Sequence, residues 1–245
     1  MLQYGPVSSS YDPLCLIMMP SLLHSGYCGE KGHSRRVAYL ANHCDGHRGR
    51  YDIALVRLRS LRRLTFHLAT GFWDLGHKLF RTTPETYPAK FLAGSAFDDA
   101  HLCPTAPMPP GPSPPVESVN TLTELRGHIS VIHTSSLFHL FNEVKQFELS
   151  QRLAALLDLR PGSIIFGSHG GSPVKGQGGG LFPKMFCHSP ESWIEMWEEQ
   201  IFQKGQVKAT AVVVEMKGAA ERLGVAPPSE EEAKFHALIW SVTRL

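Results

Sequence analysis

The sequence has no long hydrophobic run. No stretch of the 245 residues approaches the roughly 20 consecutive apolar residues that a membrane helix needs. Residues 14–23 are apolar but cover only about half that length, and Asp12 precedes them where a secretion signal would carry positive charge. We therefore expect a cytoplasmic protein with no membrane partner.

Cysteine is scarce and scattered. The five cysteines are an odd number without regular spacing, which indicates free thiols in a reducing compartment rather than a disulfide framework. They are Cys15, Cys28, Cys44, Cys103 and Cys187.

Acidic residues are few in the first quarter of the chain. Residues 1–63 hold four Asp/Glu against nine Lys/Arg, a net charge of +5, whereas residues 64–245 hold eighteen against fifteen, a net charge of −3. A basic arm is typical of nucleic-acid binding, but this one has no Lys/Arg helix face and no ordered aromatic residues. We predict no nucleic-acid partner, and we keep a metal- or nucleic-acid-binding adaptor as an alternative function.

The same segment lacks hydrophobic periodicity and paired cysteine knuckles. Only residues 51–58 resemble a strand, so we predict that residues 1–63 are irregular. Structural zinc usually takes Cys-x2-4-Cys pairs, which are missing, and we predict no metal site. The histidines and cysteines considered for it are His24, Cys28, His33, His43, Cys44 and His47.

A βαβ unit is the clearest pattern in the chain. The β-branched run at 129–132 predicts a buried strand, and helical spacing of apolar residues from 140 to 157 predicts a helix. Pro161 and Gly162 end that helix, and residues 163–166 predict a second strand parallel to the first.

Ligands of open α/β sheets bind where parallel strands end at their carboxyl side. In this unit those positions are 133–136 and 167–171, which we take as candidate site loops. Both stretches are polar or glycine-rich, with two histidines, His133 and His169.

Further elements follow from Leu64 onward, so we predict an ordered domain over residues 64–245. Its fold class is α/β, with a mostly parallel sheet and an antiparallel last strand. The predicted strands are 64–68, 90–97, 207–216 and 235–244, and the predicted helices are 71–80, 119–126 and 189–201, the last capped by Ser189 with Pro190 following.

Six segments together resemble a known family. The segments are GFWDLGHKLF from Gly71, FLAGSAFDD from Phe91, VIHTSSLFHLF from Val131, PGSIIFGSHGG from Pro161, FCHSPESW from Phe186 and WSVTRL from Trp240. They resemble fungal S-adenosyl-L-methionine-dependent methyltransferases of secondary-metabolite clusters, such as those of austinol and terretonin biosynthesis. The resemblance implies a Rossmann-like methyltransferase sheet and an O-methyltransferase that methyl-esterifies a small-molecule polyketide or meroterpenoid acid, with a homodimer as the candidate assembly.

The resemblance also implies cofactor-binding positions. His67 stands where the family has an acid for the ribose hydroxyls, Ser95 and Ala96 stand at the adenine side, and His133 and Thr134 flank the methionine part. An acid there makes hydrogen bonds worth about 1.5–3 kcal/mol, so His67 predicts cofactor binding about ten- to a hundredfold weaker.

The family's glycine-rich turn after the first strand has no match upstream of residue 64. We therefore predict that the first βα unit is missing or degraded, and we interpret residues 1–63 as out of frame or mis-spliced, with ordinary divergence as the alternative.

Methyl transfer from a sulfonium is an in-line displacement, so the protein mainly aligns the two reactants and excludes water. A carboxylate acceptor needs no general base, whereas a phenol does. His133, His139 and His188 are the titratable candidates, and a structural role is the alternative for each. A non-catalytic methyltransferase relic is the alternative for the whole chain.

Overall fold

The computed structural model describes residues 36–41, 62–67, 70–87, 89–105, 111–178, 185–217 and 234–245, with backbone alone at 36–41, 62–67 and 70–72. Within these ranges no helix has the length and apolar character needed to cross a membrane.

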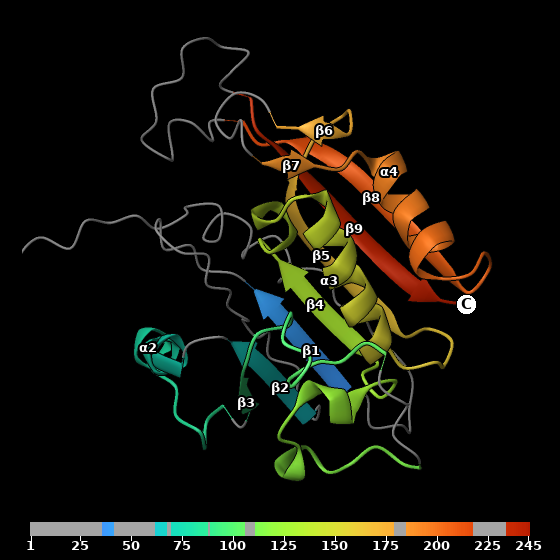
Figure 1. The fold of residues 1–245 in the computed structure, drawn as a ribbon. Helices are drawn as coiled ribbons and strands as arrows, with labels where there is room; N and C mark the ends of the chain where they lie inside the picture. The colour runs from blue at the N-terminus through green and yellow to red at the C-terminus, as the bar shows by residue number, and fades with distance from the viewer. Residues whose placement is uncertain are drawn as a thin grey trace, which may run out of the picture.

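A seven-stranded mixed sheet organises the molecule, with strand order β3-β2-β1-β4-β5-β9-β8 (Figure 1). Neighbours from β3 through β5 are parallel, and β9 runs antiparallel to both β5 and β8. The strands are β1 (Arg36–Ala41), β2 (Arg62–His67), β3 (Ala89–Ala93), β4 (Val131–Ser135), β5 (Ile164–Gly171), β8 (Val207–Glu215) and β9 (His236–Arg244). This topology confirms the predicted Rossmann-like sheet with its antiparallel last strand.

One strand of the sheet comes from the segment predicted to be irregular. β1 lies between β2 and β4, with Ala38 paired to Leu64 on one side and to Ile132 on the other. The prediction that residues 1–63 are irregular is therefore wrong for β1 and for the start of β2. Six residues are too few to show a hydrophobic period, and a central strand is specified largely by its partners on both sides. The rest of the first βα unit and the strand predicted at 51–58 fall outside the described residues.

The helices lie largely where their periodicity predicts them. They are α2 (Thr70–Phe80), α3 (Glu143–Leu156) and α4 (Pro190–Glu195), which continues as a π-helix η5 (Met196–Ile201). The Asn142 side chain caps α3 by accepting from the Lys145 N–H at 3.0 Å. Ser189 caps α4 with Pro190 in its first turn, as predicted.

Shorter elements make the connections. They are the 3-10 turns η2 (Val116–Ser118), η3 (Leu122–Leu125) and η4 (Phe138–Leu140), and the paired two-residue strands β6 (Gly176–Gln177) and β7 (Phe186–Cys187). Only η3 forms where a helix was predicted at 119–126, and its N-terminus is closed by a capping box between Thr121 and Glu124.

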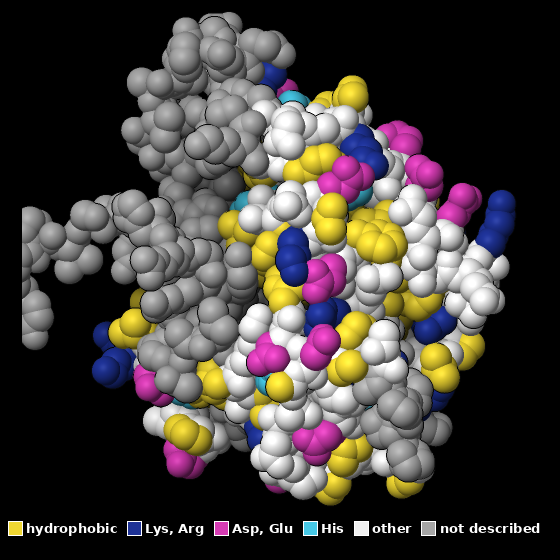
Figure 2. Space-filling model, viewed as in Figure 1, with side chains coloured by type: hydrophobic (Ala, Val, Ile, Leu, Met, Phe, Trp, Pro, Cys, Tyr) yellow, Lys and Arg dark blue, Asp and Glu magenta, His cyan; other side chains and the backbone are white. Residues whose placement is uncertain are grey.

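Helices α3 and α4 pack on the same face of the sheet (Figure 1). Leu149 and Leu153 of α3 are fully buried against a core that includes Ile132 of β4 and Ile165 of β5. Trp193 of α4 continues this core toward the strand pair β8 and β9. In the coloured part of the face shown in Figure 2, cationic and anionic side chains are interspersed among apolar ones, so the described residues form no patch of one sign there.

Candidate functional site

Five parallel strands end at the same edge of the sheet, which we call the carboxyl edge. Their last residues are Ala41, His67, Ala93, Ser135 and Gly171. The chain leaves β1 toward β2 and leaves β4 toward β5, on opposite sides, so the topological switch point lies between β1 and β4. Four of the five terminal residues are small, which lets a ligand approach the backbone closely. Ligands of open α/β sheets bind at this edge, where His67 is the one bulky terminal residue.

The backbone turns sharply where β4 ends. Ser136 has a φ of +51°, a left-handed conformation that non-glycine residues adopt at a cost of roughly 1–3 kcal/mol. The turn is held because the Ser136 N–H donates to the Ser168 carbonyl oxygen at 2.7 Å. Such strained residues cluster at ligand sites, and this one lies beside the switch point.

The predicted site residues His133 and Thr134 lie within β4 rather than in a loop beyond it. Consecutive strand residues face opposite sides of a sheet, so their side chains point away from each other. The imidazole Nε2 of His133 is 2.9 Å from Ser135 Oγ, and burial lowers the pKa of His133 to about 4. Thr134 lies beside Gly167, where a Cβ would approach the Thr134 carbonyl oxygen to 1.5 Å, so only glycine fits.

The two predicted site loops, 133–136 and 167–171, thus begin before the strands end in the structure. β4 continues to Ser135 and β5 to Gly171 because these residues pair with neighbouring strands. The pairing satisfies their backbone N–H and C=O groups, although their polar or glycine side chains do not indicate a strand. The joint role of His133 and Thr134 at the cofactor stays a prediction.

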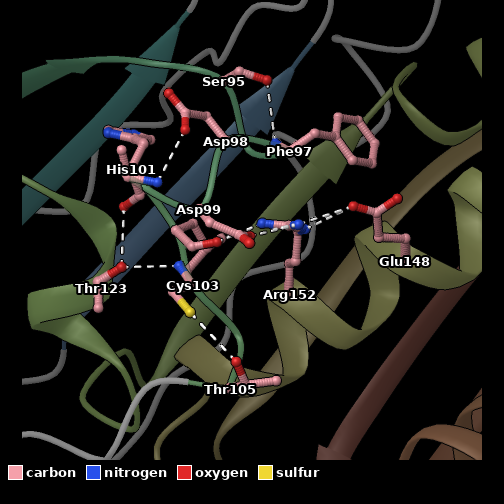
Figure 3. Close-up of polar contacts among 12 residues, drawn as sticks. Ser95, Phe97, Asp98, Asp99, His101, Cys103, Thr105, Thr123, Glu148 and Arg152 are labelled. Atoms are coloured by element: carbon pink, nitrogen blue, oxygen red, sulfur yellow. Dashed lines mark hydrogen bonds and ion pairs between the residues drawn. The ribbon is translucent and has the colours of Figure 1, made fainter.

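The other predicted cofactor residues follow β3 or end β2. Ser95 begins a compact loop in which its Oγ accepts from the Phe97 N–H at 3.2 Å and its carbonyl accepts from the Asp98 N–H at 3.1 Å (Figure 3). Ala96 packs against the core. His67 pairs with Ala93 across the ladder, so the ends of β2 and β3 are neighbours. His67, Ser95 and Ala96 therefore lie on the same part of the carboxyl edge.

An arginine of α3 holds the loop after β3. Arg152 Nη2 is 2.9 Å from Asp99 Oδ1 and 2.9 Å from Glu148 Oε1, and its Nη1 donates to the Leu102 carbonyl oxygen (Figure 3). The Arg152 side chain is 7% exposed and the Asp99 side chain 71%, so only the Arg152 end of the ion pair is shielded from water. The spacing of Glu148 and Arg152 predicts a pair on one helix face, but nothing in the sequence indicates the partner loop.

A cluster of buried rings lies at the carboxyl end of β5. Trp193 contacts His169 and His188, with ring centroids 4.7 Å and 5.3 Å apart. Phe138 of η4 contacts both His169 and Trp193, which joins the cluster to the end of β4. The candidate catalytic residue His139 adjoins it, with Nδ1 accepting from the Gly170 N–H at 3.4 Å.

Both imidazoles that contact Trp193 are neutral at neutral pH. Burial, with smaller contributions from His139 and His188, lowers the pKa of His169 well below its ordinary value. Burial lowers the pKa of His188 to about 4. The sequence indicates His169 and His188 separately but not their shared contact with Trp193, because His169 lies in β5 and His188 lies between β7 and α4.

No group of three or more His, Cys, Asp or Glu residues is arranged to hold a metal ion in the part of the chain that the structure describes. The six histidines and cysteines considered from His24 to His47 lie outside it. Cys103 and Cys187 are not joined in a disulfide, and burial raises the pKa of Cys187 to about 11.

A fungal protein of known name resembles the chain in sequence. No family model matches the chain. The O-methyltransferase phiE of a fungal species (strain ATCC 74256) is 30% identical over 179 residues, covering 68% of this chain and 53% of that protein. The chain thus spans about half the length of the curated relative it matches.

Two solved structures resemble the chain distantly. A CurJ carbon methyltransferase matches with a TM-score of 0.41 and 12% identity, over 77% of this chain and 43% of its own. The YcgJ protein of Bacillus subtilis matches with a TM-score of 0.41 and 9% identity, over 76% and 83%. At these values the two structures carry no information on the activity of this chain.

Proposed function

We propose that this chain acts in S-adenosyl-L-methionine-dependent O-methylation of a small-molecule polyketide or meroterpenoid acid, producing a methyl ester. One observation carries the proposal: the sheet has a switch point with small strand-ending residues, in a chain 30% identical to a protein named for O-methyl transfer. The proposal applies to the matched region, because the relative is about twice as long as that region.

The carboxyl edge supplies the residues that would hold the cofactor. Bound there, S-adenosyl-L-methionine supplies an electrophilic methyl group. His67 would face the ribose, Ser95 and Ala96 the adenine, and His133 and Thr134 the methionine part. Arg152 keeps the loop carrying Ser95 and Ala96 against α3, so that loop is positioned before any ligand arrives.

The buried histidines favour a carboxylic acid over a phenol as the acceptor. A carboxyl group, with a pKa near 4, is ionised at pH 7 and needs no base, whereas a phenol with a pKa near 10 must lose a proton to its partner. His133, with a pKa of about 4, is a weak base for that task. The chain then has only to orient one carboxylate oxygen and exclude water.

The test is an assay with methyl-labelled S-adenosyl-L-methionine and 2,4-dihydroxy-6-methylbenzoic acid, an aromatic polyketide-type acid. The matched control acceptor is 5-methylresorcinol, which keeps both phenols and lacks the carboxyl group. We expect label that mild alkali releases, as from an ester, and none on the control. Absence of transfer, or label on the phenols, would contradict the proposal.

A second candidate function is a non-catalytic methyltransferase relic. The histidine at position 67, where related enzymes are expected to have an acid, is the observation that favours it. Isothermal titration with S-adenosylhomocysteine separates the two, because a relic gives no binding and an enzyme must bind its own product.

A further inference from the structure

The segment from His188 to Trp193 is not used by the proposed cofactor site, yet it is locally organised. Ser189 Oγ accepts from the Ser192 N–H at 3.2 Å, which begins α4. Ser192 Oγ in turn lies 2.9 Å from His188 Nδ1. The residues that cap α4 therefore hold the His188 ring through its Nδ1, and Trp193 directly follows Ser192, the residue that makes this contact.

Three ring nitrogens in this cluster have no hydrogen-bond partner among the described residues: His169 Nε2, His188 Nε2 and Trp193 Nε1. Their residues are 1%, 2% and 0% exposed. A buried polar group left unpaired costs about 1–3 kcal/mol. His169 and His188 each contact Trp193, so these three nitrogens lie on adjoining rings. Trp197 Nε1, on a ring that contacts Trp193 but no histidine, also lacks a partner among the described residues.

At least two of these nitrogens are hydrogen-bond donors. An indole Nε1 can only donate. His169 Nδ1 accepts from the Trp240 Nε1–H at 3.0 Å, so the proton of this neutral ring is on Nε2. Two buried N–H groups with no acceptor call for an oxygen atom with lone pairs, and they exclude a cation.

The position of the cluster agrees with an acceptor rather than a cofactor. It lies at the carboxyl end of β5, and Phe138 connects it to the turn after β4. The cofactor candidates Ser95 and His67 follow β3 and end β2, on the other side of β1. A methyl acceptor has to approach the donor across this same edge.

We propose that His169 and Trp193 form a subsite that binds the carboxylate of the methyl acceptor, with the His188 ring packed against Trp193 beside it. The N–H groups of His169 and Trp193 hold one oxygen, which orients the other oxygen as the methyl-accepting atom. A carboxylate fits better than a phosphate, because these donors are neutral and Lys175, the cation that acts on His188, is already ion-paired with Glu143. The inference rests on the proposed function and names its acceptor site.

The direct test uses the indole N–H signals of protein labelled with 15N-tryptophan and saturated with S-adenosylhomocysteine. The chain has four tryptophans, and the Trp193→Phe variant assigns the Trp193 signal. Titration with 2,4-dihydroxy-6-methylbenzoate should move that signal to saturation, whereas its methyl ester should not. An unmoved signal, or an equal response to the ester, overturns the subsite.

Kinetics of the same variant give a second measurement. Trp193→Phe keeps an aromatic ring, although a smaller one, and removes one donor, so the KM of the acid should rise about ten- to a hundredfold, with the affinity for S-adenosylhomocysteine within about twofold. The matched control is Trp197→Phe, an equally buried indole in the same helical segment with no histidine among its ring contacts.

The outcomes separate the subsite from the proposed function. An unchanged KM in Trp193→Phe means that the nitrogens bind a buried water only, and it overturns the subsite while leaving the methyltransferase intact. Failure of the wild-type protein to bind S-adenosylhomocysteine contradicts the proposed function itself, and the subsite falls with it.

Discussion

His67 ends β2 beside Ala93, at the edge where an acid would accept hydrogen bonds from ribose hydroxyls. An imidazole has no carboxylate oxygens to accept from both ribose hydroxyls, so His67→Asp should raise the affinity for S-adenosylhomocysteine about ten- to a hundredfold. Isothermal titration measures it. Thr65→Asp, which adds the same charge two residues earlier in the strand, is the control and should give no gain. Equal affinities for wild type and His67→Asp would place the ribose elsewhere.

His133 and His188 each have a pKa lowered by burial from 6.5 to about 4. The unfolded chain therefore binds protons more readily below pH 6.5, and the unfolding free energy should fall as pH drops toward 4. The slope is about 1.4 kcal/mol per pH unit for each ring. Urea unfolding at pH 7, 6 and 5 measures it. In the variant His188→Gln the unfolding free energy should change less steeply with pH than in wild type. An identical slope would contradict the lowered pKa of His188.

At the scale of elements, Arg152 joins α3 to the loop after β3 through Asp99, Glu148 and Leu102. Arg152→Met should lower the unfolding free energy by about 2 kcal/mol, because the bonds from a buried guanidinium, including the one to the Leu102 carbonyl oxygen, are lost. It should also weaken S-adenosylhomocysteine binding by releasing the loop.

The control for Arg152→Met is Arg160→Met. Arg160 forms a similar pair with Asp158, but its side chain is 56% exposed, so the cost should stay below about 1 kcal/mol. Equal losses in the two variants, measured by urea unfolding, would show that the Arg152 contacts do not hold the loop.

The helices could be predicted from the sequence, whereas the ends of the strands could not. α2 and α3 carry apolar residues at helical spacing, and Ser189 followed by Pro190 indicates the start of α4. Serine and glycine at the ends of β4 and β5 have little strand preference, and only the neighbouring strands extend them. For the same reason the contact of His169 with Trp193 could not be predicted, since it depends on how β5 and α4 pack.

At the scale of the whole molecule, the sheet is continuous only because β1 fills its centre. The backbone of Ala38 is paired on both sides, so Ala38→Pro removes a donor and should lower the unfolding free energy by more than about 2 kcal/mol. Ala38→Gly, which keeps the N–H, should cost about 1 kcal/mol or less. Equal unfolding free energies of Ala38→Pro and wild type in urea would show that β1 is not part of the sheet.

The central claim is that the carboxyl edge at the β1/β4 switch point holds the methyl donor. Hydrogen exchange measured by mass spectrometry, with and without S-adenosylhomocysteine, tests it on the unmodified chain. The product should slow exchange at the ends of β1, β2 and β4, near Ala41, His67 and Ser136, and leave β8 unchanged. Protection confined to other segments, or none at saturating product, would contradict the account.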